Sequence, residues 1–368
     1  MKAASLWIAA LALLWSCGTS PDRTGAVTDS AASRLDSYFK EAFPADEPGG
    51  AVLVMSGDSV LFSGAYGLAD LRTKEHVTTN TLFNLGSVSK TFVAFGILRL
   101  RDEGRLSLND SLWEYFPRFR DKKIAQRVRI SHLLTHTSGL PDIRFPYRDS
   151  VFYLTARDAE NWAPILKTEK LNFEPGTRFE YSNPAFNALA LIIEQVSGRK
   201  WQDYITEEIL RPSGMTTSTI TDGPHPDSGV SHGYIFSRGE WLEKDYMEEP
   251  TFAASGNGGV WSSVEELARY ESAIRKAIFL NAATIEEART PKRFPGMPDT
   301  TVARLGWSWF IGRTEEGLTT VGHTGSQGGF RAEYRAIPER GQLIIILSAA
   351  PRPLEHHSGR ILEFLQGL

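Results

Sequence analysis

Strand-like segments occur at both ends of this chain, and segments with helical spacing lie between them. Near the N-terminus, the apolar runs 51–55 and 60–62 are separated by turn residues at 56–59, which predicts a hairpin within 50–71. From about 105 to 250, apolar positions recur at helical spacing, with Pro and Gly between them. Alternating runs typical of antiparallel strands return near the C-terminus, at 305–312, 318–322, 329–337 and 342–347. One sheet therefore has to be assembled from both ends of the chain, around an inserted, mostly helical region.

This order of segments predicts an α/β fold of the α+β type, in which helices flank an antiparallel sheet. An amphipathic helix over 34–43 is expected to pack on the sheet, and a closing helix is expected over 357–365. A longer apolar helix is predicted to begin near Ser87 and to end near Asp102, because Gly104 is suited to cap it. The antiparallel runs do not fit a doubly wound fold, and no Gly-x-Ser-x-Gly turn indicates an α/β-hydrolase.

Ser87 and Lys90 stand at the beginning of the long apolar helix. Residues three apart share one face of a helix, so the hydroxyl and the amine can touch. Burial disfavours the charged form of a lysine and lowers its pKa, so Lys90 is expected to act as a neutral base. Such a base can take the proton of Ser87 and make its oxygen a nucleophile. The pair alone also fits an N-cap followed by a solvated lysine.

A second candidate pair, Tyr181 and Asn183, lies just before another predicted helix, so both side chains can enter one cleft from a loop. A phenol beside a lysine ammonium favours the phenolate, so Tyr181 is expected to share proton transfer with Lys90. Asn183 offers donor and acceptor groups to hold an amide or Lys90. The alternative is a core tyrosine followed by a helix-capping asparagine.

The segment 323–330 ends one predicted strand and opens the next, and it is rich in small residues. Small residues let a substrate backbone lie against a strand edge. Within this segment, His323 and Thr324 are expected to donate hydrogen bonds to a carboxylate or a carbonyl. The alternative is a glycine-rich hairpin turn.

His132 and His136 are four residues apart, which is a spacing found in zinc sites. The zinc-peptidase pattern needs Glu where this chain has Leu133, so we interpret the two histidines as structural. No metal or organic cofactor is expected.

The first 16 residues have the pattern of a secretory signal, in which Lys2 precedes an uncharged, mostly apolar run that is too short to span a bilayer. The only cysteine, Cys17, follows this run, and residues 14–17 resemble the lipobox of bacterial lipoproteins. That resemblance implies an exported protein, anchored in the bacterial cell envelope by a lipid on Cys17 and facing the periplasm or the cell surface. Trp15 is a poor match, so a plain secretory signal is the alternative. Residues 17–32 are expected to be a flexible tether.

Composition limits the partners of the chain. Its formal net charge is -4, and no basic patch indicates nucleic-acid binding. A single cysteine cannot form an intramolecular disulfide. The expected partner is a small-molecule or peptide substrate, with membrane contact only through the lipid on Cys17. No pattern in the chain fixes its oligomeric state.

The three motifs taken together, Ser87–Lys90, Tyr181–Asn183 and His323–Gly325, resemble those of the class C β-lactamase-like serine hydrolases. That family also contains D-Ala-D-Ala carboxypeptidases, D-aminopeptidases and esterases, and the resemblance covers about 33–368. It implies that Ser87 forms an acyl-enzyme and that Lys90 and Tyr181 move its proton. It also implies that the backbone N–H groups of Ser87 and Ser326 form an oxyanion hole.

One departure from the family bears on the substrate. Many β-lactamases of this family have Lys where this chain has His323, and a fixed ammonium binds the carboxylate of a penicillin more strongly than a histidine does. The resemblance therefore implies a peptidase, amidase or esterase, possibly for a D-amino-acid peptide of the cell wall. The alternatives are a β-lactamase proper and a penicillin-binding sensor lipoprotein that is acylated once and stays trapped.

Overall fold

The computed structural model describes residues 29–142, 157–221, 223–224, 226, 228–243, 251–252, 255–294 and 305–365. The expected signal sequence, Cys17 and most of the expected tether lie outside these residues. Within the described ranges, no helix has both the length and the apolar character that crossing a bilayer requires.

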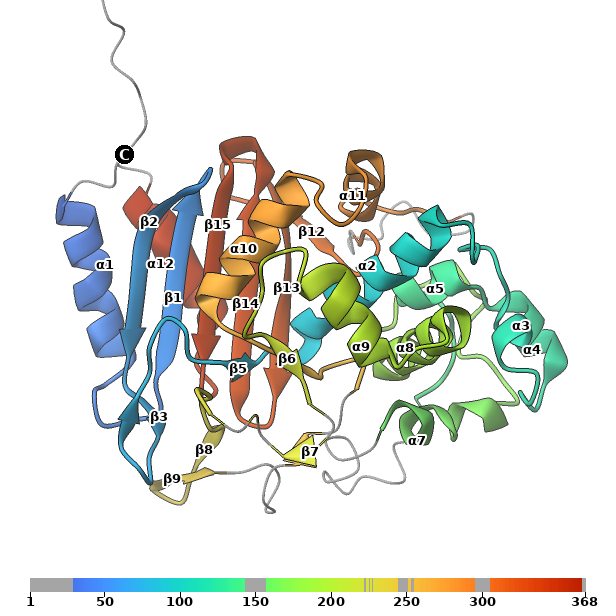
Figure 1. Ribbon diagram of the computed structural model, residues 1–368, viewed down its shortest axis with the longest axis horizontal. Coiled ribbons are helices and arrows are strands. Elements are labelled where there is room, and N and C mark those ends of the chain that lie inside the picture. Colours follow the sequence, from blue (N-terminus) through green and yellow to red (C-terminus); the bar gives the residue numbers. More distant parts are fainter. Residues whose placement is uncertain are drawn as a thin grey trace, which may run out of the picture.

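A six-stranded antiparallel sheet forms the centre of the fold, with the strand order β12-β13-β14-β15-β1-β2 (Figure 1). The predicted N-terminal hairpin is β1 (Gly50–Ser56) and β2 (Ser59–Tyr66). The predicted C-terminal strands are β12 (Phe310–Arg313), β13 (Thr319–Gln327), β14 (Phe330–Ile337) and β15 (Gln342–Ser348). Strand β1 pairs with β15 along its whole length, from Gly50 opposite Ser348 onward. The two ends of the chain therefore form one sheet, and the predicted fold class is confirmed.

Both faces of the sheet are covered by helices, as Figure 1 shows. Side chains alternate between the faces of a strand. Val52 and Val54 of β1 pack with residues of α1 (Asp29–Ala42) and α12 (Leu354–Leu365). Leu53 lies on the opposite face, in the larger core formed with α2 (Ser89–Asp102), α8 (Asn183–Ser197) and α10 (Val264–Arg275). Because side chains on both faces of β1 are buried, its sequence is a continuous apolar run and does not alternate with polar residues.

The inserted region begins with helices and then changes to short strands. Its other helices are α3 (Leu112–Tyr115), α4 (Lys122–Arg127), α5 (Ile130–Leu134), α7 (Asp158–Trp162) and α9 (Trp201–Ile205), with a 3-10 turn at Ile165–Lys167 and a π-helical turn at Thr206–Leu210. The short strands are β6 (Thr219–Ile220), β7 (Gly223–Pro224), β8 (Tyr234–Ser237) and β9 (Glu240–Glu243). The helical region predicted to reach 250 was therefore too long. Arg238 and Gly239 both have positive φ, and they form the tight turn that makes β8 and β9 a hairpin.

Smaller elements complete the structure around the site. They are β3 (Leu68–Asp70), β4 (Glu75–His76), β5 (Phe83–Asn84), β10 (Thr251–Phe252), β11 (Val260–Ser262), α11 (Ala282–Ala288) and a 3-10 turn at Pro338–Arg340. A further 3-10 turn, Gly86–Val88, leads directly into α2, in which every residue from Ser89 to Leu98 is buried. Phe92 of α2 stacks on Tyr270 of α10 with ring centroids 4.2 Å apart, which fixes α2 against its neighbours.

Candidate active site

Ser87 and Lys90 are in contact at the start of α2. The Nζ atom of Lys90 donates a 2.9 Å hydrogen bond to Oγ of Ser87 and a 2.7 Å hydrogen bond to the carbonyl oxygen of Asn257. Lys90 is fully buried, and its Nζ lies 5.2 Å from the ring centroid of Tyr181 and 5.7 Å from that of Phe186. The amine is therefore held in one position, with one of its contacts on the serine hydroxyl.

Two glycines bring the backbone of the Gly86–Val88 turn against strand β13. Gly86 has a φ of +49°, and a Cβ atom there would lie 2.7 Å from the backbone nitrogen of Ser326. A Cβ atom on Gly325 would lie 1.9 Å from the carbonyl oxygen of Leu85 and 3.2 Å from the backbone nitrogen of Ser87. Only residues without a Cβ fit this approach. The backbone nitrogens of Ser87 and Ser326 are thus brought to the same place.

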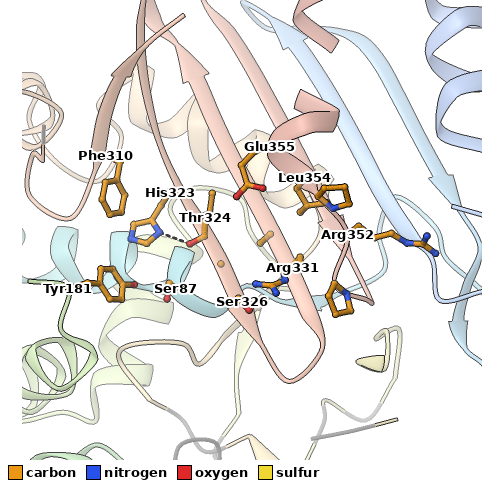
Figure 2. Close-up of a pocket in the computed structure, with 14 residues that line it drawn as sticks. Ser87, Tyr181, Phe310, His323, Thr324, Ser326, Arg331, Arg352, Leu354 and Glu355 are labelled. Carbon is orange, nitrogen blue, oxygen red and sulfur yellow. Dashed lines mark hydrogen bonds between the residues drawn. The ribbon is translucent and has the colours of Figure 1, made fainter. Parts of the chain in front are cut away.

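The serine hydroxyl opens into a cleft of about 630 Å³. Its lining includes six of the residues that the sequence analysis singled out: Ser87, Tyr181, His323, Thr324, Gly325 and Ser326. Figure 2 shows Tyr181 and Ser87 on one side of His323 and Thr324, with Ser326 further along. His323 to Ser326 lie within β13 itself, which continues to Gln327, so the alternative of a hairpin turn over these residues is wrong. The volume is in the range of pockets that hold small organic ligands.

Tyr181 keeps its proton at neutral pH, contrary to the phenolate expected from its neighbour Lys90. Burial of the phenol raises the pKa of Tyr181 to about 12, and a hydrogen bond with Ser87 opposes this only in part. The ring stacks on His136 with centroids 4.4 Å apart, and 38% of the residue remains open to the cleft. The expectation of a phenolate was wrong because it considered only the charge of Lys90. It did not consider that losing water around the Tyr181 hydroxyl raises the pKa of the phenol.

His323 is uncharged and therefore has only one ring proton to donate. Burial, followed by the nearby charge of Lys90, lowers the pKa of His323 to about 3. A neutral imidazole carries one proton, and here Nδ1 donates a 2.6 Å hydrogen bond to the carbonyl oxygen of Thr324. Nε2 then bears only a lone pair, and no residue in the described part of the chain donates to it.

Asn183 is the first residue of α8, not a loop residue, and it is absent from the described lining of the cleft. Ser182 caps this helix, since its Oγ accepts from the backbone nitrogen of Ala185 at 3.3 Å. The carbonyl group that holds Lys90 belongs instead to Asn257, in a turn that the sequence marks only by the glycines on either side of this residue.

A buried polar network supports that turn from behind. Asn187 of α8 donates to Asn257 Oδ1 at 2.9 Å and to the carboxyl group of Asp158 at 2.7 Å. The backbone nitrogen of Gly256 also donates to Asp158, at 2.9 Å. Burial raises the pKa of Asp158 to about 7. None of these residues stands out in the sequence, because the network joins segments that are far apart in the chain.

His132 and His136 each accept a hydrogen bond from a backbone N–H group through Nδ1. The donors are Arg129 at 3.2 Å and Ser182 at 3.0 Å. Among the residues that the structure describes, no three His, Cys, Asp or Glu side chains gather where they could hold a metal ion. These contacts agree with the structural role expected for both histidines.

The buried histidines predict a loss of stability in mild acid. Burial lowers the pKa of His132 and His357 to about 4, that of His323 to about 3, and that of His136 well below 6.5. Unfolding lets them bind protons, so between about pH 6.5 and pH 4 the unfolded chain gains stability as the pH falls. The raised pKa values of Asp158, Glu333 and His232 act in the opposite direction.

We expect the four buried histidines to outweigh these three groups. Each histidine that is not offset should lower the free energy of unfolding by about 1.4 kcal/mol per pH unit. Thermal unfolding followed between pH 7 and pH 4.5 measures this. His357→Gln should reduce the pH dependence, whereas the same change at the exposed His76 should leave it unaltered. A melting temperature that stays constant down to pH 4.5 would contradict the prediction.

A serine in contact with a buried lysine, on a helix packed against an antiparallel sheet, defines the class of β-lactamase-fold serine hydrolases. The chain belongs to the Beta-lactamase family, whose family model matches residues 36–367.

The chain is similar to several known members. It is 29% identical to "Penicillin-binding protein 4*" of Bacillus subtilis (strain 168) over 88% of this chain and 72% of that protein. It is 32% identical to "Protein flp" of Staphylococcus aureus (strain COL) over 86% of this chain and 63% of that protein. Among solved structures, an octameric penicillin-binding protein homologue from Pyrococcus abyssi superposes with a TM-score of 0.79, at 26% identity, over 91% of this chain and 77% of that one.

Proposed function

We propose that this chain is an exported serine hydrolase that cleaves an amide or ester bond through an acyl-enzyme on Ser87. The observation that carries the proposal is the 2.9 Å contact between Ser87 Oγ and Lys90 Nζ, at the floor of a cleft beside the backbone nitrogen of Ser326. An acyl-transfer nucleophile needs a neighbouring base and donors for the developing oxyanion, and this cleft holds both.

The reaction follows from these positions. Lys90, in its neutral form, takes the proton of Ser87 while Oγ attacks the substrate carbonyl carbon. The carbonyl oxygen becomes an oxyanion that the N–H groups of Ser87 and Ser326 bind. When the carbon–nitrogen or carbon–oxygen bond breaks, the phenol of Tyr181 gives its proton to the leaving group, and the protonated Lys90 restores it. Water then attacks the acyl-enzyme with the same groups acting in reverse, which releases the acid and regenerates Ser87.

We favour a D-amino-acid peptide of the cell wall as the substrate class. The name of the Bacillus relative as a penicillin-binding protein supports a site of this kind. A β-lactamase proper is the second candidate, but the uncharged His323 disfavours it, since it offers no fixed charge for a penicillin carboxylate. A trapped penicillin-binding sensor is the non-enzyme alternative. A stable adduct without turnover of any ester or peptide would favour that alternative.

The hydrolase proposal is tested by trapping the acyl-enzyme. We expect a short-chain p-nitrophenyl ester, quenched in acid during turnover, to leave one acyl group on the peptide that contains Ser87, as intact-mass and peptide mass spectrometry report. The adduct should disappear in Ser87→Ala. It should persist in Ser326→Ala, which keeps the backbone N–H. Continued ester hydrolysis by a folded Ser87→Ala protein would refute the proposal.

We also propose that Cys17 carries a lipid that anchors the protein in the cell envelope. Cys17 directly follows the apolar run of the signal-like segment. Two or more acyl chains give stable anchoring, whereas one chain gives only weak binding. In a bacterial host, the wild-type protein is expected in the membrane fraction and to incorporate labelled fatty acid. The same label in Cys17→Ala would argue against this site.

A further inference from the structure

His136 adopts a conformation that costs free energy. It is fully buried two residues after the end of α5, and its φ of +55° lies in a region that residues other than glycine rarely adopt. Its Nδ1 accepts from the backbone nitrogen of Ser182, so the one proton of the neutral ring is on Nε2, and no residue in the described part of the chain accepts it. Backbone strain and a buried donor without an acceptor are both unfavourable, and strain of this kind is typical of functional sites.

The contacts of His136 converge on three consecutive residues before α8. Its carbonyl oxygen accepts a 2.9 Å hydrogen bond from the backbone nitrogen of Glu180, and its Nδ1 accepts a 3.0 Å hydrogen bond from that of Ser182. Between these two bonds, its ring stacks on the ring of Tyr181, with centroids 4.4 Å apart and planes inclined by 27°. One buried side chain therefore fixes the backbone on both sides of Tyr181 and the plane of its phenol.

Tyr181 needs this support because its own segment lacks regular structure. Residues 178–182 belong to no helix or strand, and 38% of Tyr181 is open to the cleft. Exposed side chains change rotamer rapidly unless contacts restrain them. His136 is itself tied to α5, since its backbone nitrogen donates to the carbonyl oxygen of Leu133 at 3.2 Å. The phenol is thus positioned from α5 through the stacked imidazole.

The position of the phenol matters for the proposed proton transfer. Figure 2 shows the ring of Tyr181 directed toward Ser87, with which its hydroxyl shares a hydrogen bond. Proton transfer requires the two heavy atoms to be within hydrogen-bond distance, and a displacement of about 1 Å can cost about 100-fold in rate. Burial, followed by the charge of Lys90, holds the pKa of His136 well below 6.5, so Nδ1 keeps its lone pair for Ser182 at neutral pH.

We propose that His136 is a positioning residue, which holds the phenol of Tyr181 where it can protonate the leaving group. This inference rests on the proposed hydrolase function. His136 is outside the described lining of the cleft, so it acts through the tyrosine. The effect should depend on the leaving group, because p-nitrophenolate departs without a proton whereas an alkoxide has to receive one. A displaced phenol would therefore slow alkyl esters and spare p-nitrophenyl esters.

The experiment compares ethyl butyrate with p-nitrophenyl butyrate, which share an acyl group and differ in the leaving group. In His136→Asn, the new side chain tolerates a positive φ and its Oδ1 can accept from Ser182, so mainly the stacked ring is lost. We expect kcat/KM to fall by about 10- to 100-fold for the ethyl ester and to stay within about threefold for the p-nitrophenyl ester. Tyr181→Phe should show a larger loss of the same kind, and adding His136→Asn to it should cause no further loss.

The matched control is His132→Asn. His132 also accepts a backbone N–H group through Nδ1, from Arg129 at 3.2 Å, but its ring lies against Phe294 and not against the tyrosine. The ratio of the two kcat/KM values should remain that of the wild-type protein. An equal loss for both esters in His136→Asn would overturn the inference, and so would a loss that adds to that of Tyr181→Phe. Either result would show that the histidine only supports the fold.

A measurement without turnover separates this inference from the hydrolase proposal. In protein labelled with ¹³C at tyrosine Cζ, the NMR signal that Tyr181→Phe removes belongs to Tyr181. We expect one sharp line in the wild-type protein and in His132→Asn, and a shifted or broadened line in His136→Asn, because the ring is then free to move. An unchanged line would overturn the inference. If the wild-type protein cleaves neither ester, the hydrolase proposal fails, and this signal still tests whether His136 holds the phenol.

Discussion

Replacing Lys90 by methionine is expected to lower kcat/KM for any ester or peptide substrate by about 10³- to 10⁵-fold. Methionine is similar in length but cannot accept a proton or donate to Ser87 Oγ and the Asn257 carbonyl. The serine hydroxyl would then have to lose its proton to water. Steady-state hydrolysis of a p-nitrophenyl ester measures the loss, and thermal unfolding shows whether the fold survives.

Lys90→Arg separates proton transfer from charge. Arginine keeps the positive charge and donors, but it is not deprotonated in proteins and cannot act as a base. If Lys90 is the base, both variants lose activity to a similar degree. An active Lys90→Arg protein would show that the lysine acts only through its charge, and the proposed proton path would be wrong.

Replacing Gly325 by alanine is expected to have the second largest effect, a fall of about 10²- to 10³-fold in kcat/KM. The new Cβ would lie 1.9 Å from the carbonyl oxygen of Leu85 and 3.2 Å from the backbone nitrogen of Ser87. Both are backbone atoms, so strand β13 and the Gly86–Val88 turn have to move apart. The nitrogens of Ser87 and Ser326 would then no longer converge on one oxyanion.

Gly312→Ala is the matched control for this prediction. Gly312 lies on the neighbouring strand β12, and a Cβ there would meet only the hydroxyl of Thr320, at 2.7 Å, which can rotate away. We expect near wild-type kcat/KM for Gly312→Ala. A Gly325→Ala protein with wild-type turnover would show that the two backbone nitrogens do not act together. Loss of stability alone, with kcat/KM unchanged, would lead to the same conclusion.

Local patterns predicted most of the elements that build the sheet. The hairpin of β1 and β2 and the strands β13 to β15 follow from alternation and turn residues, because these signals extend over a few neighbouring positions. The chain from β6 to β9 was misjudged, since a short hairpin such as β8–β9 has too few residues to show the repeat of a strand. Pairing of β1 with β15 could be inferred only from the need to place both ends in one sheet.

The candidate site was predicted unevenly for a similar reason. The contact of Ser87 with Lys90 depends on three-residue spacing in one helical segment. Lys90 and Asn257 are 167 positions apart in the sequence, so no local pattern predicts their contact. The protonation state of Tyr181 was also misjudged, because it depends on the water that packing removes from around the phenol.

By itself, the sequence determined which segments are strands and helices, where the nucleophile stands, and that its lysine shares its helix face. These properties arise from the repeat of a helix or strand, which neighbouring residues define. Only the tertiary structure decided that Asn257 holds the lysine, that Tyr181 and His323 are uncharged, and that a buried histidine stacks on the tyrosine. These depend on burial and on contacts between distant segments, and free energies of desolvation and charge are set by surroundings that exist only once the chain has folded.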